Sequence, residues 1–150
     1  MPPVSPATLT WIREEPPVWD DDKERIVGGT PDGTFEGLDF EAGALVPGDW
    51  WRVEQNGKVV GYGWMDTSWG GDAQILLAVA PEARGRGIGT WILDRLEDEA
   101  RARDLCYIFN TIPPRHPDPE GLAAWLKERG FVPSPHDRLL RRRVAPPPAA

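Results

Sequence analysis

The stretch that most constrains this chain is a glycine-rich turn at residues 84–89, with the sequence RGRGIG. An apolar run, Ile75 to Val79, leads into it, and an amphipathic pattern that begins at Thr90 leads out of it. A strand, a glycine-rich turn and a helix in this order direct backbone N–H groups to one point, where the positive end of the helix dipole adds to them. The two arginines favour the same kind of ligand. We therefore interpret the turn as a cradle for a pyrophosphate.

Three phosphate-binding motifs place glycines in such a turn, and two of them do not fit. The phosphate-binding loop of nucleotide hydrolases ends in Gly-Lys-Ser/Thr, which the turn lacks. The dinucleotide fingerprint needs a third glycine three residues after the second, whereas Gly85, Gly87 and Gly89 alternate. The remaining pattern, Arg/Gln-x-x-Gly-x-Gly, matches residues 84–89. In this pattern, with its strand and helix, the chain resembles the GNAT superfamily of N-acetyltransferases.

The resemblance implies that acetyl-CoA binds at the turn and along the strand before it. In the family, backbone N–H groups of the turn bind the pyrophosphate, and the strand holds the pantetheine arm by strand-like hydrogen bonds. The cofactor-binding residues predicted on this basis are Leu77, Val79, Arg84, Gly85, Arg86, Gly87, Ile88, Gly89, Thr90 and Asn110. For Asn110, a cap at the end of a strand is an equal alternative. No metal site is assigned.

Acyl transfer also needs a donor to the thioester oxygen, because that oxygen gains negative charge during attack. The backbone N–H of Leu77 is the predicted catalytic donor. In the family a bulge in this strand leaves such an N–H free and splays the two parallel strands. The resemblance therefore implies that the cofactor enters between Val79 and the strand at residues 105–110.

The proton-transfer groups depart from the family pattern. Family enzymes often use a glutamate near the start of this strand, where the chain has Ala73. The neighbouring Asp72 is the predicted catalytic base, and Asp66 and Glu54 are alternatives. Many relatives protonate the departing thiolate with a tyrosine four residues before a Gly-Phe pair, where this chain has Leu126. A thiol with a pKa near ~8.5 can leave as the thiolate, so this departure does not exclude activity.

The implied fold class is α/β, with a GNAT-like mixed, mostly antiparallel sheet, a central splayed parallel pair of strands and flanking helices. Alternation and apolar runs predict strands at 9–13, 50–54, 58–66, 74–79, 105–111 and 138–144. Helical periodicity and caps predict helices at 90–103 and 119–129, with a helical turn near 23–27. The helix between the fourth and fifth strands predicts that these two strands are parallel.

Residues 28–48 depart from the family, which usually has two helices between its first and second strands. The segment carries six glycines and two prolines and has no helical period. We therefore predict that a Gly/Pro-rich loop reduces or replaces those helices. A loop of this length is often functional, and two interpretations stay open: a tolerated connection, or a lid over the acceptor site.

The composition bounds the location and the partners. A chain of 150 residues predicts a single domain at 1–150, with disordered ends at 1–7 and 145–150. The lack of a long apolar run, of signal-peptide features and of a second cysteine predicts a cytoplasmic protein without a membrane partner. The apolar neighbours of the single cysteine, Cys106, predict that it is buried. A net charge of −7 argues against nucleic acid and favours a cationic acceptor, and a homodimer stays open.

The function implied is transfer of an acetyl group from acetyl-CoA to an amine of a small molecule or peptide, by direct attack in a ternary complex. One alternative is a catalytically weak or inactive acyl-CoA-binding or interaction module of the same fold, since the usual acid is absent. Another is transfer of a longer acyl group, with Trp50, Trp51, Trp64 and Trp69 lining a wider pocket.

Overall fold

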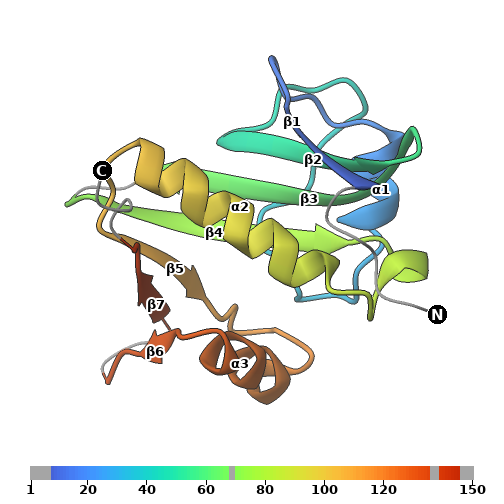
Figure 1. The fold of residues 1–150 in the computed structure, drawn as a ribbon. Helices are drawn as coiled ribbons and strands as arrows, with labels where there is room; N and C mark the ends of the chain where they lie inside the picture. The colour runs from blue at the N-terminus through green and yellow to red at the C-terminus, as the bar shows by residue number, and fades with distance from the viewer. Residues whose placement is uncertain (1–7, 68–69, 136–138, 146–150) are drawn as a thin grey trace.

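The computed structural model describes residues 8–67, 70–135 and 139–145. Within these ranges the strands form one seven-stranded sheet in the order β1-β2-β3-β4-β5-β7-β6 (Figure 1). The strands are β1 (Leu9–Arg13), β2 (Asp49–Gln55), β3 (Lys58–Thr67), β4 (Asp72–Val79), β5 (Tyr107–Thr111), β6 (Val132–Pro133) and β7 (Leu139–Arg143). The helices are α1 (Asp21–Ile26), the 3₁₀ helix η2 (Pro81–Ala83), α2 (Ile88–Ala102) and α3 (Pro119–Glu128). Apart from Ala145, the residues predicted to be disordered, 1–7 and 145–150, lie outside the described residues, as does Trp69, for which a pocket role was considered.

The sheet is mixed, and the predicted fold class is confirmed. Of the strand pairs in the described ranges, β4 and β5 are parallel and the others are antiparallel. Helix α2 connects the parallel pair, as predicted. The β2–β3 hairpin turns at Asn56 and Gly57, which both have positive φ angles, as the Asn-Gly signal predicts. None of the described helices is both long enough and apolar enough to cross a bilayer.

The two parallel strands separate toward their carboxyl ends. Their ladder runs only from Asp72 to Gln74 on β4, although β4 continues to Val79. Just beyond the ladder, Asn110 Nδ2 donates to the carbonyl of Ile75 at 2.8 Å, so a side chain replaces the next backbone bond. Figure 1 shows β5 turning away from β4 from this point.

The bulge implied for β4 is wrong. The pairing of β4 with β3 runs without a shift, and the register shift of the sheet lies in β2, between Val53 and Glu54. The divergence therefore arises on the β5 side, where Asn110 ends the ladder.

Helix α2 packs on one face of the sheet over two glycines of β3. Its buried face consists of Ile88, Ile92, Leu93, Leu96 and Ala100. A Cβ atom at Gly63 would lie 2.6 Å from Trp11 and 3.2 Å from both Ile92 and Leu96. The distance to Trp11 is shorter than any that real Cβ atoms show, and the distances to the helix are tighter than most, so glycine at this position lets both Trp11 and α2 pack closely on the sheet.

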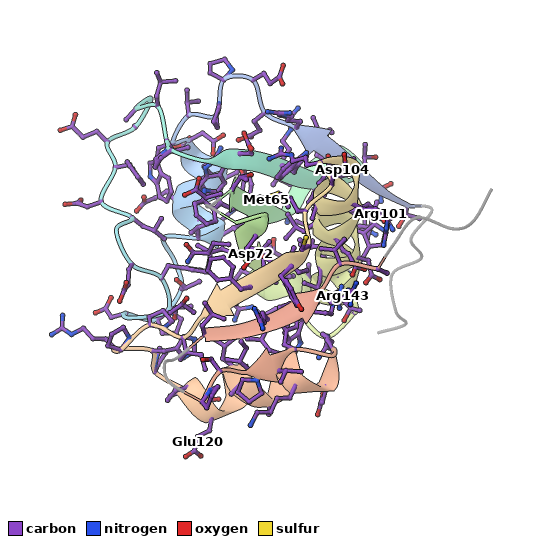
Figure 2. The ribbon with its side chains drawn as sticks, turned by 90° about the vertical axis from the view of Figure 1, so that its left-hand side faces the viewer. Met65, Asp72, Arg101, Asp104, Glu120 and Arg143 are labelled. Carbon is purple, nitrogen blue, oxygen red and sulfur yellow. The ribbon has the colours of Figure 1, made fainter. Side chains whose placement is uncertain are left out.

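The loop at residues 28–48 covers the opposite face, so that Figure 2 shows α2 and this loop on opposite sides of the sheet. All of its residues are described and none is helical, which confirms the predicted loop. Its side chains Phe35, Leu38 and Phe40 pack against the core. A β-bridge between Val18 and Leu45 ties its end to the segment after β1.

A buried lysine, which the sequence reading missed, supports this loop side of the sheet. Lys23 of α1 has a fully buried side chain, and its Nζ atom lies 2.5 Å from Glu14 and 3.4 Å from Asp20. The same Nζ lies 5.3 Å from the ring centre of Trp50 and 4.9 Å from that of Tyr62. Two carboxylates and two aromatic faces therefore compensate the burial of this charge.

The predicted burial of Cys106 is wrong, because this side chain is exposed. Strand β5 begins one residue later, at Tyr107. The backbone N–H of Cys106 donates to Gly71 (2.7 Å), so the residue belongs to the approach to the sheet and not to its core.

Candidate active site

The glycine-rich turn leads into an open helix N-terminus. Gly85 and Gly87 have φ angles of 77° and 84°, a region that glycine adopts without strain. A Cβ atom at either position would meet no atom within 4 Å, so the space beside the turn is free. Gly87 is the N-cap of α2 and supplies no side-chain hydrogen bond to the first turn of the helix. The N–H groups of that turn have no acceptor within the helix and face a ligand or solvent.

A cavity of about 390 Å³, here called the turn cavity, lies at this helix end. Its lining includes most of the predicted cofactor-binding residues: Leu77, Val79, Arg84, Gly85, Gly87, Ile88, Gly89 and Thr90. Arg86 and Asn110 were predicted with them but do not line it. The lining also contains residues that the sequence reading missed: Thr30, Thr34, Phe35, Ala78, Ala83, Trp125 and Arg129.

Arg129 places a fixed positive charge in the turn cavity. Its Nε donates to Thr90 Oγ1 at 3.0 Å, and a terminal nitrogen donates to the Trp125 carbonyl at 2.9 Å. Its guanidinium also lies 3.9 Å from the centre of the Trp125 ring. Arg129 is the C-cap of α3 and Thr90 lies in the first turn of α2, so the contact brings together residues that are 39 positions apart. Nothing in the sequence pattern marks this pairing.

The backbone of β4 turns selected N–H groups toward the diverging strand. The N–H of Ala80 bonds to β3 at 2.8 Å, whereas the carbonyl of Ile75 accepts from Asn110 on the β5 side. Peptide groups of a strand alternate sides with a period of two, so Leu77 and Val79 share the direction of Ile75. Their N–H groups therefore face the side on which the β5 ladder has ended. This direction suits the roles predicted for them, which remain predictions.

A second cavity of about 360 Å³, here called the loop cavity, lies under the 28–48 loop. It shares Phe35, Leu77 and Ala78 with the turn cavity, so the two are adjacent near the carboxyl end of β4. The rest of its lining is Val27, Glu36, Gly37, Leu38, Phe40, Pro47, Trp50, Tyr62, Trp64, Gln74, Leu76, Thr111, Pro113 and Pro114. The loop therefore forms part of the wall of both cavities.

Tyr62, which lines the loop cavity, keeps its buried hydroxyl protonated. Burial, together with the nearby charge of Asp20, raises the pKa of the Tyr62 phenol well above its ordinary value. Its hydroxyl donates to Asp20 Oδ1 at 3.4 Å. The group is therefore a hydrogen-bond donor at all physiological pH values.

The predicted base, Asp72, lies outside both cavities. It begins β4, while Leu77 is five residues further on, or ~16 Å at the usual rise of an extended strand. Figure 2 shows Asp72 on the end of the sheet that faces the viewer, away from the turn at the other end of β4. Neither alternative base, Asp66 or Glu54, lines a cavity, and Glu54 accepts from Arg52 Nε at 2.6 Å. The base role of Asp72 stays a prediction that this position does not favour.

One carboxylate that the sequence reading missed lies on the lining of the loop cavity, at an exposed residue. Among the described residues that line the turn and loop cavities, Glu36 is the only acidic one. It follows Phe35, which lines both cavities. Leu126, in the position of the expected acid, is buried at 3% exposure and offers no proton.

Comparison with known sequences identifies related proteins. A sequence model described as the Acetyltransferase (GNAT) family matches residues 6–131. Proteins named amino-acid acetyltransferase from Pseudomonas syringae pv. syringae and Pseudomonas fluorescens (strain SBW25) are 41% identical over 69 residues. The match covers 46% of this chain but only 14% of each relative.

Solved structures share the fold at low sequence identity. The N-acetylglutamate synthase from Neisseria gonorrhoeae, complexed with coenzyme A and N-acetyl-glutamate, aligns with a TM-score of 0.55 and 22% identity. That alignment covers 64% of this chain and 26% of the synthase. An IAA acetyltransferase from Bacillus cereus aligns with a TM-score of 0.56 and 16% identity, over 64% of this chain and 77% of the other. At such identities the likeness concerns the fold alone.

Proposed function

The chain belongs to the acetyltransferase (GNAT) family, and on this premise we propose that it transfers an acetyl group from acetyl-CoA to an amine by direct attack in a ternary complex. The observation that carries the proposal is the turn cavity, where free space beside Gly85 and Gly87 meets an uncapped helix N-terminus. The coenzyme A in the N-acetylglutamate synthase complex supports the choice of cofactor.

The residues of the turn cavity fit a coenzyme A diphosphate in both shape and charge. Backbone N–H groups at the start of α2 would donate to the diphosphate, and the positive end of the helix would favour its negative charge. Arg129, already oriented by Thr90 and Trp125, would add a cation beside it. The N–H groups of Leu77 and Val79 would hold the arm that leads to the thioester.

The proposed reaction balances without a further reactant. Acetyl-CoA would supply the acetyl group as a thioester: its C–S bond breaks as the C–N bond to the amine forms, and an ammonium acceptor gives up two protons, one to the departing sulfur and one to solvent. The Leu77 N–H would donate to the carbonyl oxygen as its negative charge grows, an interaction that lowers the barrier by a few kcal/mol in enzymes of this kind. The protein would thus hold the two reactants in position and supply the N–H dipole of Leu77.

Calorimetry of coenzyme A binding with two matched variants tests the proposal. Gly87 and Gly43 have nearly equal φ angles, 84° and 83°, and both have free space where a Cβ atom would be. Gly87→Glu and Gly43→Glu therefore introduce the same backbone strain and the same charge at different places. We expect Gly87→Glu to weaken binding at least about 100-fold, because a carboxylate would face the diphosphate, and Gly43→Glu to bind normally. Equal affinities of the two variants would contradict the proposal.

A second candidate is an acyl-CoA-binding module without catalysis. The burial of Leu126, in the position of the usual acid, favours it. Its signature would be a melting temperature that rises with acetyl-CoA while no amine releases free coenzyme A. Release of coenzyme A with any amine excludes this candidate.

A further inference from the structure

We propose that the acceptor is a primary amine carried on an apolar, preferably aromatic, body without a carboxylate, and that it binds in the loop cavity with its ammonium group toward Glu36. This inference rests on the proposed function and adds the substrate class. It follows from the lining of the loop cavity, from the only charge on that lining, and from the place where the cavity meets the turn cavity.

The wall of the loop cavity presents aromatic faces with their polar edges turned elsewhere. Trp50 and Trp64 of the β2–β3 hairpin both donate their indole N–H to the carbonyl of Pro47, each at 3.0 Å. Their polar atoms are thereby satisfied, and both residues contribute to the lining of the cavity. Gly48 makes this arrangement possible, because a Cβ atom there would lie 2.2 Å from the Trp64 nitrogen.

The opposite wall comes from the loop and is also apolar. Phe35, Leu38 and Phe40 line it, each partly buried against the core. Behind the hairpin wall, Lys23 packs over the rings of Trp50 and Tyr62 and holds them in place. The cavity is therefore a preformed slot of about 360 Å³, within the usual range for a small ligand.

The charge of the lining selects among amines. Of the described residues that line the loop cavity, none is Arg, Lys or His, and Glu36 alone carries a charge. A carboxylate on the acceptor would lose water without gaining a cation, which is unfavourable. An ammonium group would instead find the Glu36 carboxylate. The chemistry of the lining thus disfavours an acidic amino acid as acceptor.

The position of Glu36 also suits transfer. Its neighbour Phe35 lines both cavities, together with Leu77, whose N–H faces the side where the thioester would lie. Glu36 is exposed, so it would hold the ammonium group at the rim of the loop cavity, with the apolar body of the amine along the aromatic wall. Glu36 binds the ammonium in this proposal; one proton passes to solvent before the amine attacks, and the second passes to the departing sulfur.

Matched acceptors test the substrate class. 2-Phenylethylamine and L-phenylalanine share an aromatic body and an ammonium group and differ in one carboxylate. At saturating acetyl-CoA we expect kcat/KM for 2-phenylethylamine to exceed that for L-phenylalanine and for L-glutamate at least about tenfold, measured as release of coenzyme A. Equal or reversed preference would overturn the inference. A faster release of coenzyme A from hexanoyl-CoA than from acetyl-CoA, if 2-phenylethylamine does not inhibit it, would also overturn the inference. The cavity would then hold the acyl chain.

Two matched loop variants test the role of Glu36. Glu36→Gln and Glu41→Gln remove the same charge from the same loop, but Glu41 does not line the cavity. We expect Glu36→Gln to raise the KM for 2-phenylethylamine about fivefold, with unchanged calorimetric affinity for acetyl-CoA, and Glu41→Gln to behave as the parent protein. A KM that is equal in all three proteins would overturn the assignment.

Binding without turnover separates this inference from the proposed function. The indoles of Trp50 and Trp64 line the loop cavity, so 2-phenylethylamine should quench the intrinsic fluorescence in the absence of acetyl-CoA. Quenching by 2-phenylethylamine but not by L-glutamate supports the amine site even if no coenzyme A is released. Acetyl-CoA binding without any quenching or turnover overturns the amine site alone, whereas failure to bind coenzyme A refutes the proposed function.

Discussion

The turn cavity and the loop cavity share Phe35, Leu77 and Ala78 but are built from different parts of the chain. The turn cavity lies where the glycine-rich turn, the N-terminus of α2 and the diverging end of β4 meet, with Trp125 and Arg129 beside them. The loop cavity is formed by side chains that come from a hairpin, a loop and the segment after β5. Under the proposed function, the cofactor would bind at the turn and the helix N-terminus, whereas the acceptor would bind to side chains of the loop cavity. Side chains change more readily than backbone geometry, so substitutions would alter the acceptor site before the cofactor site.

The largest expected effect is a loss of stability when Lys23 is replaced, without a change at the turn cavity. Lys23→Met leaves the carboxylates of Glu14 and Asp20 without their buried partner, so we expect a loss of about 3 kcal/mol in the free energy of unfolding. Urea denaturation measures it, with the exposed Lys127→Met as control. The affinity of the folded fraction for coenzyme A should not change, because Lys23 supports only the loop-cavity wall. A parallel loss of coenzyme A affinity would show that Lys23 supports both cavities.

An intermediate effect on coenzyme A affinity is expected at Arg129, which lines the turn cavity. Arg129→Ala removes a cation that is held by Thr90 and Trp125, and we expect coenzyme A to bind about tenfold more weakly, or about 1.4 kcal/mol. Arg143→Ala, on the exposed end of β7, is the control. Calorimetry measures the change, and fluorescence quenching by 2-phenylethylamine should stay the same. An unchanged coenzyme A affinity would remove Arg129 from the site.

A smaller effect on stability is expected at Glu82, which lies in η2, just before the glycine-rich turn. It pairs with Arg25 of α1 at 2.9 Å and with Lys58 of β3 at 3.0 Å. A hydrogen bond from its own backbone N–H, and then these two cations, lower the pKa of the Glu82 carboxyl. Its contribution is therefore present above the ordinary carboxyl pKa, near ~4.3, and is lost as the pH falls through the lower folded value.

The partly exposed position of Glu82 limits this contribution to a few tenths of a kcal/mol. Glu82→Gln should unfold at lower urea than the parent protein at pH 7, and the difference should vanish near pH 3. A difference that grows as the pH falls would contradict the sign. Glu41→Gln is the control.

The smallest effect is expected at Asp72. Because it lies at the far end of β4 and lines neither cavity, Asp72→Asn should change kcat/KM less than about twofold. A loss of 100-fold or more, with a pH profile that loses its acidic limb, would instead restore Asp72 as the base. Steady-state rates between pH 5 and pH 9 distinguish the two outcomes.

The sequence predicted the elements whose signals are local. The glycine-rich turn, the face of α2, the Asn-Gly hairpin and the parallel crossover each depend on residues close together in the chain. The prediction at Cys106 was wrong because β5 starts one residue later, at Tyr107. The bulge implied for β4 was wrong because the strands part on the β5 side, at the Asn110 contact with Ile75, which joins residues 35 positions apart.

The sequence by itself determined that this chain would carry an anion-binding turn between a strand and a helix, because glycine and helix geometry act within a few residues. Only the tertiary structure decided what surrounds that turn. Arg129, Phe35 and Glu36 reach the cavities through packing between distant segments, and the pattern of the chain does not encode which side chains meet there. Backbone conformation is a local property, whereas the lining of a cavity depends on the whole fold.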